Sequence, residues 1–224
     1  MQIDPYLILV FIHVLLFAYW LGGDLGVFVA AGYVADRKLS LEERFRFMHL
    51  LMVCDMGPRT ALILFLPVGF QMARTLGVAE IGAEVTGALW VVCLAWLAVN
   101  WWMFKNERHP AAARLRTADI YLRYVVMAAM GALGLYSFAT GGPLTTHWLA
   151  AKVFLFACTM LLGVYLRGEI KQWIVGFGMV REGGDAADRG NTIIEQSLVR
   201  SRRAALLLWF GVALIAFLGL TKPF

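Results

Sequence analysis

The first apolar stretch of the chain covers residues 6–34 and reads YLILVFIHVLLFAYWLGGDLGVFVAAGYV. About 20 helical residues, at roughly 1.5 Å each, cross the hydrocarbon core of a bilayer, so this stretch is long enough to span it. It is too long for the core of a signal peptide, and no small-residue cleavage pattern follows it before Asp36-Arg37-Lys38. We therefore expect it to be a transmembrane helix of the mature protein.

Five further apolar stretches are long enough to cross a membrane. They lie at residues 46–73, 85–104, 120–140, 146–166 and 204–220. The composition agrees, because 61% of the 224 residues are hydrophobic and only 16% are charged, which is too apolar for a soluble domain of this length. The sequence predicts an all-α protein in which residues 1–224 form a single polytopic bundle of about six transmembrane helices.

Basic residues cluster in alternate connections between these stretches. The basic connections are residues 36–46, 105–116 and 167–203. The other two, at 75–84 and 140–145, have only the neighbouring Arg74. The positive-inside rule then places the basic connections in the cytoplasm and both termini on the non-cytoplasmic side. We expect a bacterial cytoplasmic (inner) membrane protein with a cytoplasmic interfacial segment at 167–203. In it, a glycine-rich linker at 181–190 separates two helix ends, at 169–180 and 193–203.

The net charge of +5 does not indicate a nucleic-acid partner, because the basic residues lie where the positive-inside rule expects them. Cys54, Cys93 and Cys158 lie in apolar stretches without a Cys-x-x-Cys pair. The sequence therefore indicates neither a disulfide framework, nor a zinc site, nor covalent haem attachment. Its expected partners are the lipid bilayer and a small ligand, and both a homo-oligomer and a redox partner remain open.

Ionisable residues inside the expected spans fall into two layers when helix rise is converted into depth. The outer layer has His13, Arg59 and Lys152, with His147 and Trp148 just above it. The inner layer contains Asp24, His49, Asp55 and Arg123. A charge at this depth costs about 2.5–3.5 kcal/mol on insertion scales, so a bundle keeps one mainly where it is paired, wetted or bound. Both layers are therefore expected to be sites.

Several of these residues also have a purely structural interpretation. Asp55 and Arg59 are spaced i,i+4 and could neutralise each other. Arg123 could extend to the cytoplasmic interface at little cost. His13 could form a hydrogen bond between helices instead of binding a metal.

The outer layer gathers three potential cations and therefore needs an anion. Haem b meets this need, because its iron binds a neutral imidazole such as His13 and its two propionates attract Lys152 and Arg59. Its macrocycle fits an apolar slot between helices. Trp20 and Trp148 could form the walls of such a slot.

Short motifs in the first, second and fifth stretches are similar to a known family. They read Ile12-His13-Val14 with Tyr19-Trp20-Leu21-Gly22-Gly23, then Met56-Gly57-Pro58, then His147-Trp148-Leu149-Ala150-Ala151-Lys152. They resemble the HemJ-type protoporphyrinogen IX oxidases and the related CopD-type membrane proteins. The resemblance implies that His13 ligates haem b and that Lys152 is needed for activity. The chain differs from the HemJ pattern in its six spans rather than four, and in Tyr165-Leu166-Arg167 where a histidine follows the tyrosine.

The leading hypothesis is an integral membrane b-type haem protein that acts as an oxidoreductase or electron carrier. In it, His13 holds the iron and His147 is the second axial ligand. Lys152 and Arg59 neutralise the propionates or bind a substrate such as a quinone, a porphyrin or another small anion.

Acids of the inner layer complete this hypothesis. Asp24 and Asp55, together with His49, would relay protons from the cytoplasm to the reaction at Lys152. His49 is also a potential metal ligand.

Two alternatives remain open. Met48, Met52 and Met56 repeat along one helix face, and thioether ligands select Cu(I), so the chain could be a copper transport or resistance permease. The same methionines could simply fill gaps between helices. The chain could also be a membrane subunit that anchors a larger complex through residues 167–203.

Overall fold

The computed structural model describes residues 4–223, which form six long helices. These are α1 (Pro5–Ala35), α2 (Leu41–Thr75), α3 (Ala83–Lys105), α4 (Pro110–Thr140), α5 (His147–Glu182) and α6 (Gly184–Thr221). All six are long and apolar enough to cross a membrane. The structure confirms the all-helical fold and the six predicted spans.

Local capping residues explain where three of the helices begin. The Asp4 side chain accepts a hydrogen bond from the backbone of Tyr6 at the start of α1. Ser40 and Glu43 form a reciprocal capping box at the start of α2. His109 caps α4 by accepting from the backbone of Ala111. Each contact satisfies backbone N–H groups that have no partner within the helix.

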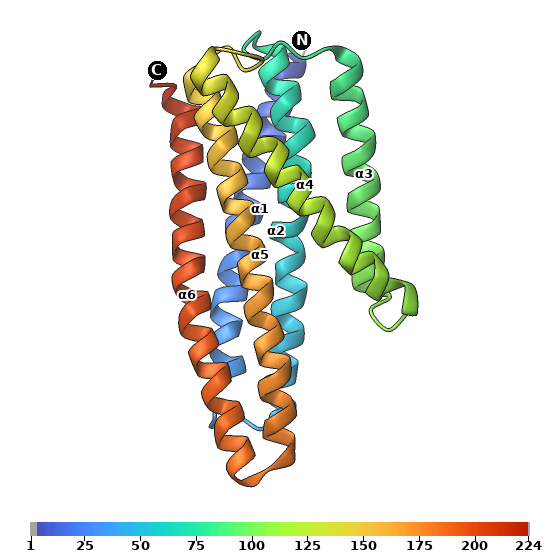
Figure 1. Ribbon diagram of the computed structural model, residues 1–224, viewed down its shortest axis with the longest axis vertical. Helices are drawn as coiled ribbons and strands as arrows, with labels where there is room; N and C mark the ends of the chain where they lie inside the picture. Colours follow the sequence, from blue (N-terminus) through green and yellow to red (C-terminus); the bar gives the residue numbers. More distant parts are fainter. Residues whose placement is uncertain (1–3, 224) are drawn as a thin grey trace.

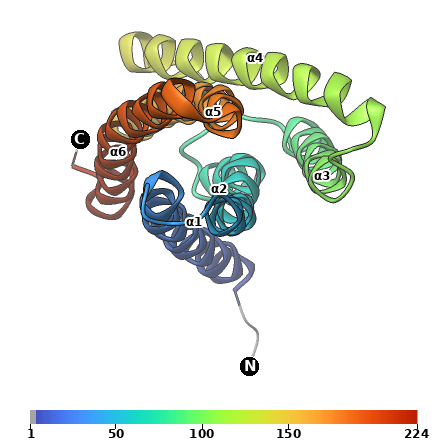
Figure 2. The same ribbon diagram turned by 90° about the horizontal axis from the view of Figure 1, so that it is seen from below.

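Helices α1, α2, α5 and α6 form the main bundle (Figure 1). Helix α4 runs obliquely along the outside of α5, and α3 lies beside α2 at the edge of the molecule (Figure 2). The two chain termini lie at the same end of the bundle, as an even number of spans requires (Figure 1). We call this the terminal end and the opposite one the hairpin end.

At the terminal end, the connection from α2 to α3 pairs with the connection from α4 to α5. The backbone N–H of Glu80 donates to the carbonyl of Pro143 at 2.8 Å, and that of Thr145 donates to the carbonyl of Val78 at 3.1 Å. These two bonds tie the end of α2 to the start of α5.

At the hairpin end, α5 and α6 extend beyond the other helices (Figure 1). With 36 and 38 residues, they are about 54 and 57 Å long at 1.5 Å per residue, well over the roughly 30 Å hydrocarbon core. The predicted linker at 181–190 is wrong, because only Gly183 separates the two helices. Its φ of 81° lies in the region that favours glycine, which allows an abrupt reversal.

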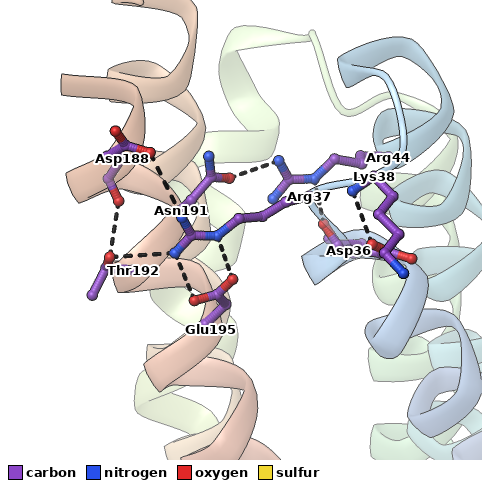
Figure 3. A network of polar contacts seen from close by, with 9 residues as sticks. Asp36, Arg37, Lys38, Arg44, Asp188, Asn191, Thr192 and Glu195 are labelled. Atoms are coloured by element: carbon purple, nitrogen blue, oxygen red, sulfur yellow. Dashed lines mark hydrogen bonds and ion pairs between the residues drawn. The ribbon is translucent and has the colours of Figure 1, made fainter. Parts of the chain in front are cut away.

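A polar network fastens the α1–α2 connection to α6 at the hairpin end (Figure 3). Arg37 donates to both carboxylate oxygens of Glu195, at 2.5 and 2.7 Å, and forms an ion pair with Asp188. Its hydrogen bonds to Glu195 raise the pKa of the Arg37 guanidinium above its ordinary value. Arg44 donates to the side-chain oxygen of Asn191 at 2.8 Å. The network therefore joins the α1–α2 pair to the α5–α6 pair beyond the apolar stretches of these helices.

Helices α1 and α2 approach closely at Gly23. A Cβ atom on Gly23 would lie 2.5 Å from Cδ of Pro58 and 2.9 Å from the carbonyl oxygen of Cys54. Small residues allow such close helix packing in membranes. The crossing places the polar residues of α1 directly beside those of α2.

The charge distribution predicts which end of the bundle faces the cytoplasm. A reporter inserted within 183–190 should report the cytoplasmic side, because the surrounding segment is strongly basic. Reporters within 76–83 or fused after Phe224 should report the opposite side. Activities of paired phosphatase and fluorescent-protein fusions measure this, and inverted signals at both ends would contradict the orientation.

Candidate functional site

A cavity of about 490 Å³ lies between α1, α2, α5 and α6 towards the terminal end. Its size falls within the roughly 300–1,000 Å³ of typical small-molecule and cofactor sites. Most of the wall is apolar, and aromatic rings make up a large share of it. These rings include Phe17, Trp20, Phe65, Phe70, Trp148 and Phe156. We call this space the outer cavity.

The outer cavity has three basic side chains on its wall and no acidic one. The basic residues are His13, Lys152 and Lys222. Lys222 Nζ lies 5.7 Å from the centre of the Trp148 ring. Among residues 4–223, neither lysine has an ion-pair partner. The wall is therefore positively charged in apolar surroundings, which favours an anionic ligand.

His13 lies on the α1 side of the outer cavity. Its ring packs edge-on against Phe65, with 4.8 Å between the ring centres. Its Nδ1 atom is buried and has no hydrogen-bond partner within the described part of the chain. A buried polar atom without a partner costs about 1–3 kcal/mol, so a bound group that satisfies the imidazole would be stabilised.

Lys152 lies opposite, on α5, against a glycine of α6. A Cβ atom on Gly219 would lie 2.6 Å from Lys152 Nζ, so the absence of a side chain there makes room for the ammonium group. Lys152 and His13 come from helices far apart in the sequence and line one cavity. The structure thus brings together the two residues that the family motifs single out.

Trp20 lines both the outer cavity and a second, inner cavity of about 120 Å³. Its ring contacts those of Phe65 and Phe156, with centre distances of 5.7 and 6.1 Å. Its indole N–H donates to a carboxylate oxygen of Asp24 at 2.8 Å. The aromatic cluster of Trp20, Phe65 and Phe156 therefore lies at the boundary between an apolar cavity and a charged one.

The inner cavity collects most of the predicted inner layer. Asp24, Asp55 and Arg123 line it, together with Arg59. Arg59 forms an ion pair with Asp55, one turn earlier on α2, so the mutual neutralisation considered from the sequence is present. Depth alone placed Arg59 with His13, but helical side chains lean towards the helix N-terminus, and for α2 that direction points to the hairpin end.

A buried carboxylate that sequence reasoning missed organises the far side of the inner cavity. Asp119 on α4 accepts hydrogen bonds from Trp96 at 2.7 Å and Asn100 at 3.1 Å, both on α3. It also accepts from Arg123 at 2.9 Å and from Arg167 of α5 at 2.7 Å. Its i,i+4 spacing from Arg123 was the available signal. We call these five residues the Asp119 cluster, and it joins α3, α4 and α5.

Two arginines share the carboxylate of Asp119. Arg123 does not extend to the interface, because it is only 5% exposed and bonds to Asp119. Arg167, at the start of the segment 167–203 that the sequence assigns to the cytoplasmic interface, lines the inner cavity and pairs with Asp119. In both, the carboxylate of Asp119 supplies the partner that makes burial tolerable.

The remaining predicted ligands lie outside both cavities. His147 is exposed and packs edge-on against Phe138, with 5.2 Å between ring centres. It precedes Lys152 by five residues, or about 140° around α5, and so lies on a different face. His49 is also exposed and lines neither cavity. Within residues 4–223, no group of three or more His, Cys, Asp or Glu side chains could hold a metal ion.

The methionine stripe on α2 packs against other helices. Met48 and Met52 contact a buried cluster that includes Leu51 and Trp173, and Met56 is only 2% exposed. These contacts agree with the gap-filling role of methionine.

Comparisons of the chain with protein-family models, with curated proteins and with solved structures find no match. Function must therefore be inferred from the two cavities and the groups on their walls.

Proposed function

We propose that this integral membrane protein binds haem b in the outer cavity and acts as an oxidoreductase or electron carrier. The composition of the cavity wall supports this proposal. Among the described residues, it combines aromatic and apolar side chains with His13, Lys152 and Lys222 and has no acidic side chain. A ligand matched to it must be largely apolar, carry negative charge and offer a partner to an imidazole. Haem b has all three properties.

Each basic residue of the wall has a distinct role in this proposal. His13 holds the iron through its imidazole, and the lysines neutralise the two propionates. Haem supplies one-electron chemistry once it is bound. The apolar wall lowers the local dielectric constant, which strengthens electrostatic contacts inside the cavity.

Acids of the inner cavity are the groups that would carry protons accompanying electron transfer in this proposal. Asp24 accepts a hydrogen bond from the indole N–H of Trp20, and Trp20 lines both cavities. Asp55 lines the same inner space. In this proposal the two acids exchange protons with the hairpin end, which the basic loops assign to the cytoplasm.

The sequence motifs support the same site. Their residues His13 and Trp20 on α1, and Trp148 and Lys152 on α5, all line the outer cavity. Residues that resemble one family signature therefore converge in space from two distant helices. This agrees with the HemJ- and CopD-type resemblance, in which the histidine ligates haem b.

Absorption spectroscopy tests the proposal directly. Purified full-length protein, titrated with haemin in detergent and then reduced, should develop a Soret band that saturates near one haem per chain in a pyridine haemochrome assay. A protein that stays colourless and leaves the spectrum of free haemin unchanged would contradict haem binding. If that colourless protein bound Cu(I), the copper alternative would replace it.

A further inference from the structure

The inner cavity has an excess of positive charge that the haem proposal does not use. Its wall includes arginines from four different helices: Arg59, Arg123, Arg167 and Arg202. Two aspartates, Asp24 and Asp55, share the wall, and Asp119 lies behind it as the partner of two of the arginines. Four guanidinium groups thus face three carboxylates, and the exposed Arg202 supplies the net positive charge that results.

Buried N–H donors without acceptors belong to residues of the same wall. Arg59 Nε, Arg123 Nη2 and Trp173 Nε1 are buried and have no hydrogen-bond partner within residues 4–223. All three residues line the inner cavity, and Arg123 and Trp173 are only 5% and 2% exposed. Buried donors are almost always paired in native proteins, so these three call for an acceptor.

The acids on the wall do not supply that acceptor. Asp24 accepts a hydrogen bond from the indole N–H of Trp20 at 2.8 Å. Asp55 forms its ion pair with Nη2 of Arg59, which leaves Nε of the same arginine without a partner among residues 4–223. Water could satisfy the free donors, but it would not balance the charge. The cavity therefore fits an anion with several acceptor oxygens.

We propose that the inner cavity is a binding site for a phosphate group, separate from the haem site. Guanidinium groups bind phosphate oxygens in paired, charge-assisted hydrogen bonds. The free donors come from α2, α4 and α5, and a tetrahedral anion presents oxygens in several directions at once, whereas a carboxylate presents two. The volume of about 120 Å³ equals roughly four waters at about 30 Å³ each, which is room for one phosphate group.

Arg202 gives the site a side chain that can be changed without removing a buried ion pair. Its guanidinium lies 5.2 Å from the Phe28 ring centre, and its Nη2 would lie 2.9 Å from a Cβ atom on Gly32. It thus reaches from α6 across to α1. Its neighbour Arg203 is also an exposed arginine and does not line the cavity, so it is a matched control.

Calorimetry of the full-length protein in phosphate-free detergent, titrated with inorganic phosphate, tests this site. Wild type should bind one phosphate per chain. Arg59→Gln and Arg202→Gln should each weaken binding about tenfold or more, since each removes a charged donor. Arg203→Gln should bind like wild type. Chloride at equal concentration should not displace the phosphate.

A second measurement distinguishes free phosphate from a lipid headgroup. The melting temperature is followed in bilayers of digalactosyldiacylglycerol, whose headgroup has no phosphate, with and without phosphatidylglycerol, in phosphate-free buffer. If phosphatidylglycerol raises the melting temperature of wild type and of Arg203→Gln but not of Arg202→Gln, the site binds a lipid headgroup. If only inorganic phosphate raises the melting temperature, the site binds the free anion. The proposal is overturned if neither probe binds, if chloride competes equally, or if Arg203→Gln loses as much affinity as Arg202→Gln. Failure of haem binding leaves these outcomes unaffected, because they concern different residues.

Discussion

Replacing His13 by alanine is expected to abolish the Soret band of haem-loaded protein while the chain still inserts and folds. Among the described residues, His13 is the only histidine on the wall of the outer cavity, so it is the only imidazole there that could bind iron. Alanine removes that ligand without lowering the hydrophobicity of the span, so insertion should not suffer. Absorbance per chain, a pyridine haemochrome assay and size-exclusion elution measure occupancy and folding together.

Lys152→Ala and His147→Ala separate ligation from general damage to the protein. In the proposed site Lys152 would neutralise a propionate rather than bond to iron, so its loss should leave the spectral shape intact and weaken haem affinity about tenfold or more. His147 lies outside both cavities, so its replacement should change neither shape nor affinity. A His13→Ala protein with a wild-type spectrum at full occupancy would make His13 a helix-packing residue, and the proposed haem site would be wrong.

Hydropathy predicts the six helices well but not their ends. The expected span 204–220 and the helix end expected at 193–203 belong to one helix, which begins at Gly184. Lipid thickness limits only the apolar part of a helix, whereas charged segments such as 181–190 continue it in water when a neighbouring helix packs against them. Glycine and charge in that segment were signs of a tight helical hairpin as well as of a linker, and composition alone does not separate the two.

Depth along a helix predicted which polar residues share a level, but not which way they face. His13 and Lys152 line one cavity, as a shared level allows. His147 shares the level of the cavity mouth yet faces Phe138, because rotation about α5 turns it away. Arg59 faces the other cavity because its side chain leans towards the start of α2. Rotation and lean depend on packing between helices, which a single sequence does not specify.

Asp119 escaped notice because it falls between two segments defined by composition. It follows the basic connection 105–116 and precedes the apolar stretch that starts at 120. Its partners Trp96 and Asn100 lie on the preceding helix, and Arg167 is distant in sequence. Only the three-dimensional arrangement shows that one carboxylate serves four donors.

Removing this carboxylate is expected to cause the largest loss of stability of any substitution considered. Asp119→Ala leaves the guanidinium groups of Arg123 and Arg167 buried without their carboxylate and frees the donors of Trp96 and Asn100. Breaking a buried ion pair by removing one partner typically costs about 3–5 kcal/mol. The free energy of unfolding, from denaturation by dodecyl sulfate in mixed micelles, should fall by about that amount. Asp119→Asn, which keeps an acceptor oxygen but loses the charge, should lie between wild type and alanine.

The exposed pair of Arg37 and Glu195 is the matched control for this prediction. It has the same guanidinium and carboxylate chemistry, but its side chains are 42% and 44% exposed. Solvent screens such a pair, so Glu195→Ala should cost about 0–1 kcal/mol. The Asp119 cluster joins α3 and α4 to α5, so a large effect at Asp119 and a small one at Glu195 would mean that this cluster holds the two outer helices on the bundle. An effect at Asp119 as small as that at Glu195 would show instead that apolar packing, and not this cluster, holds α3 and α4 on the bundle.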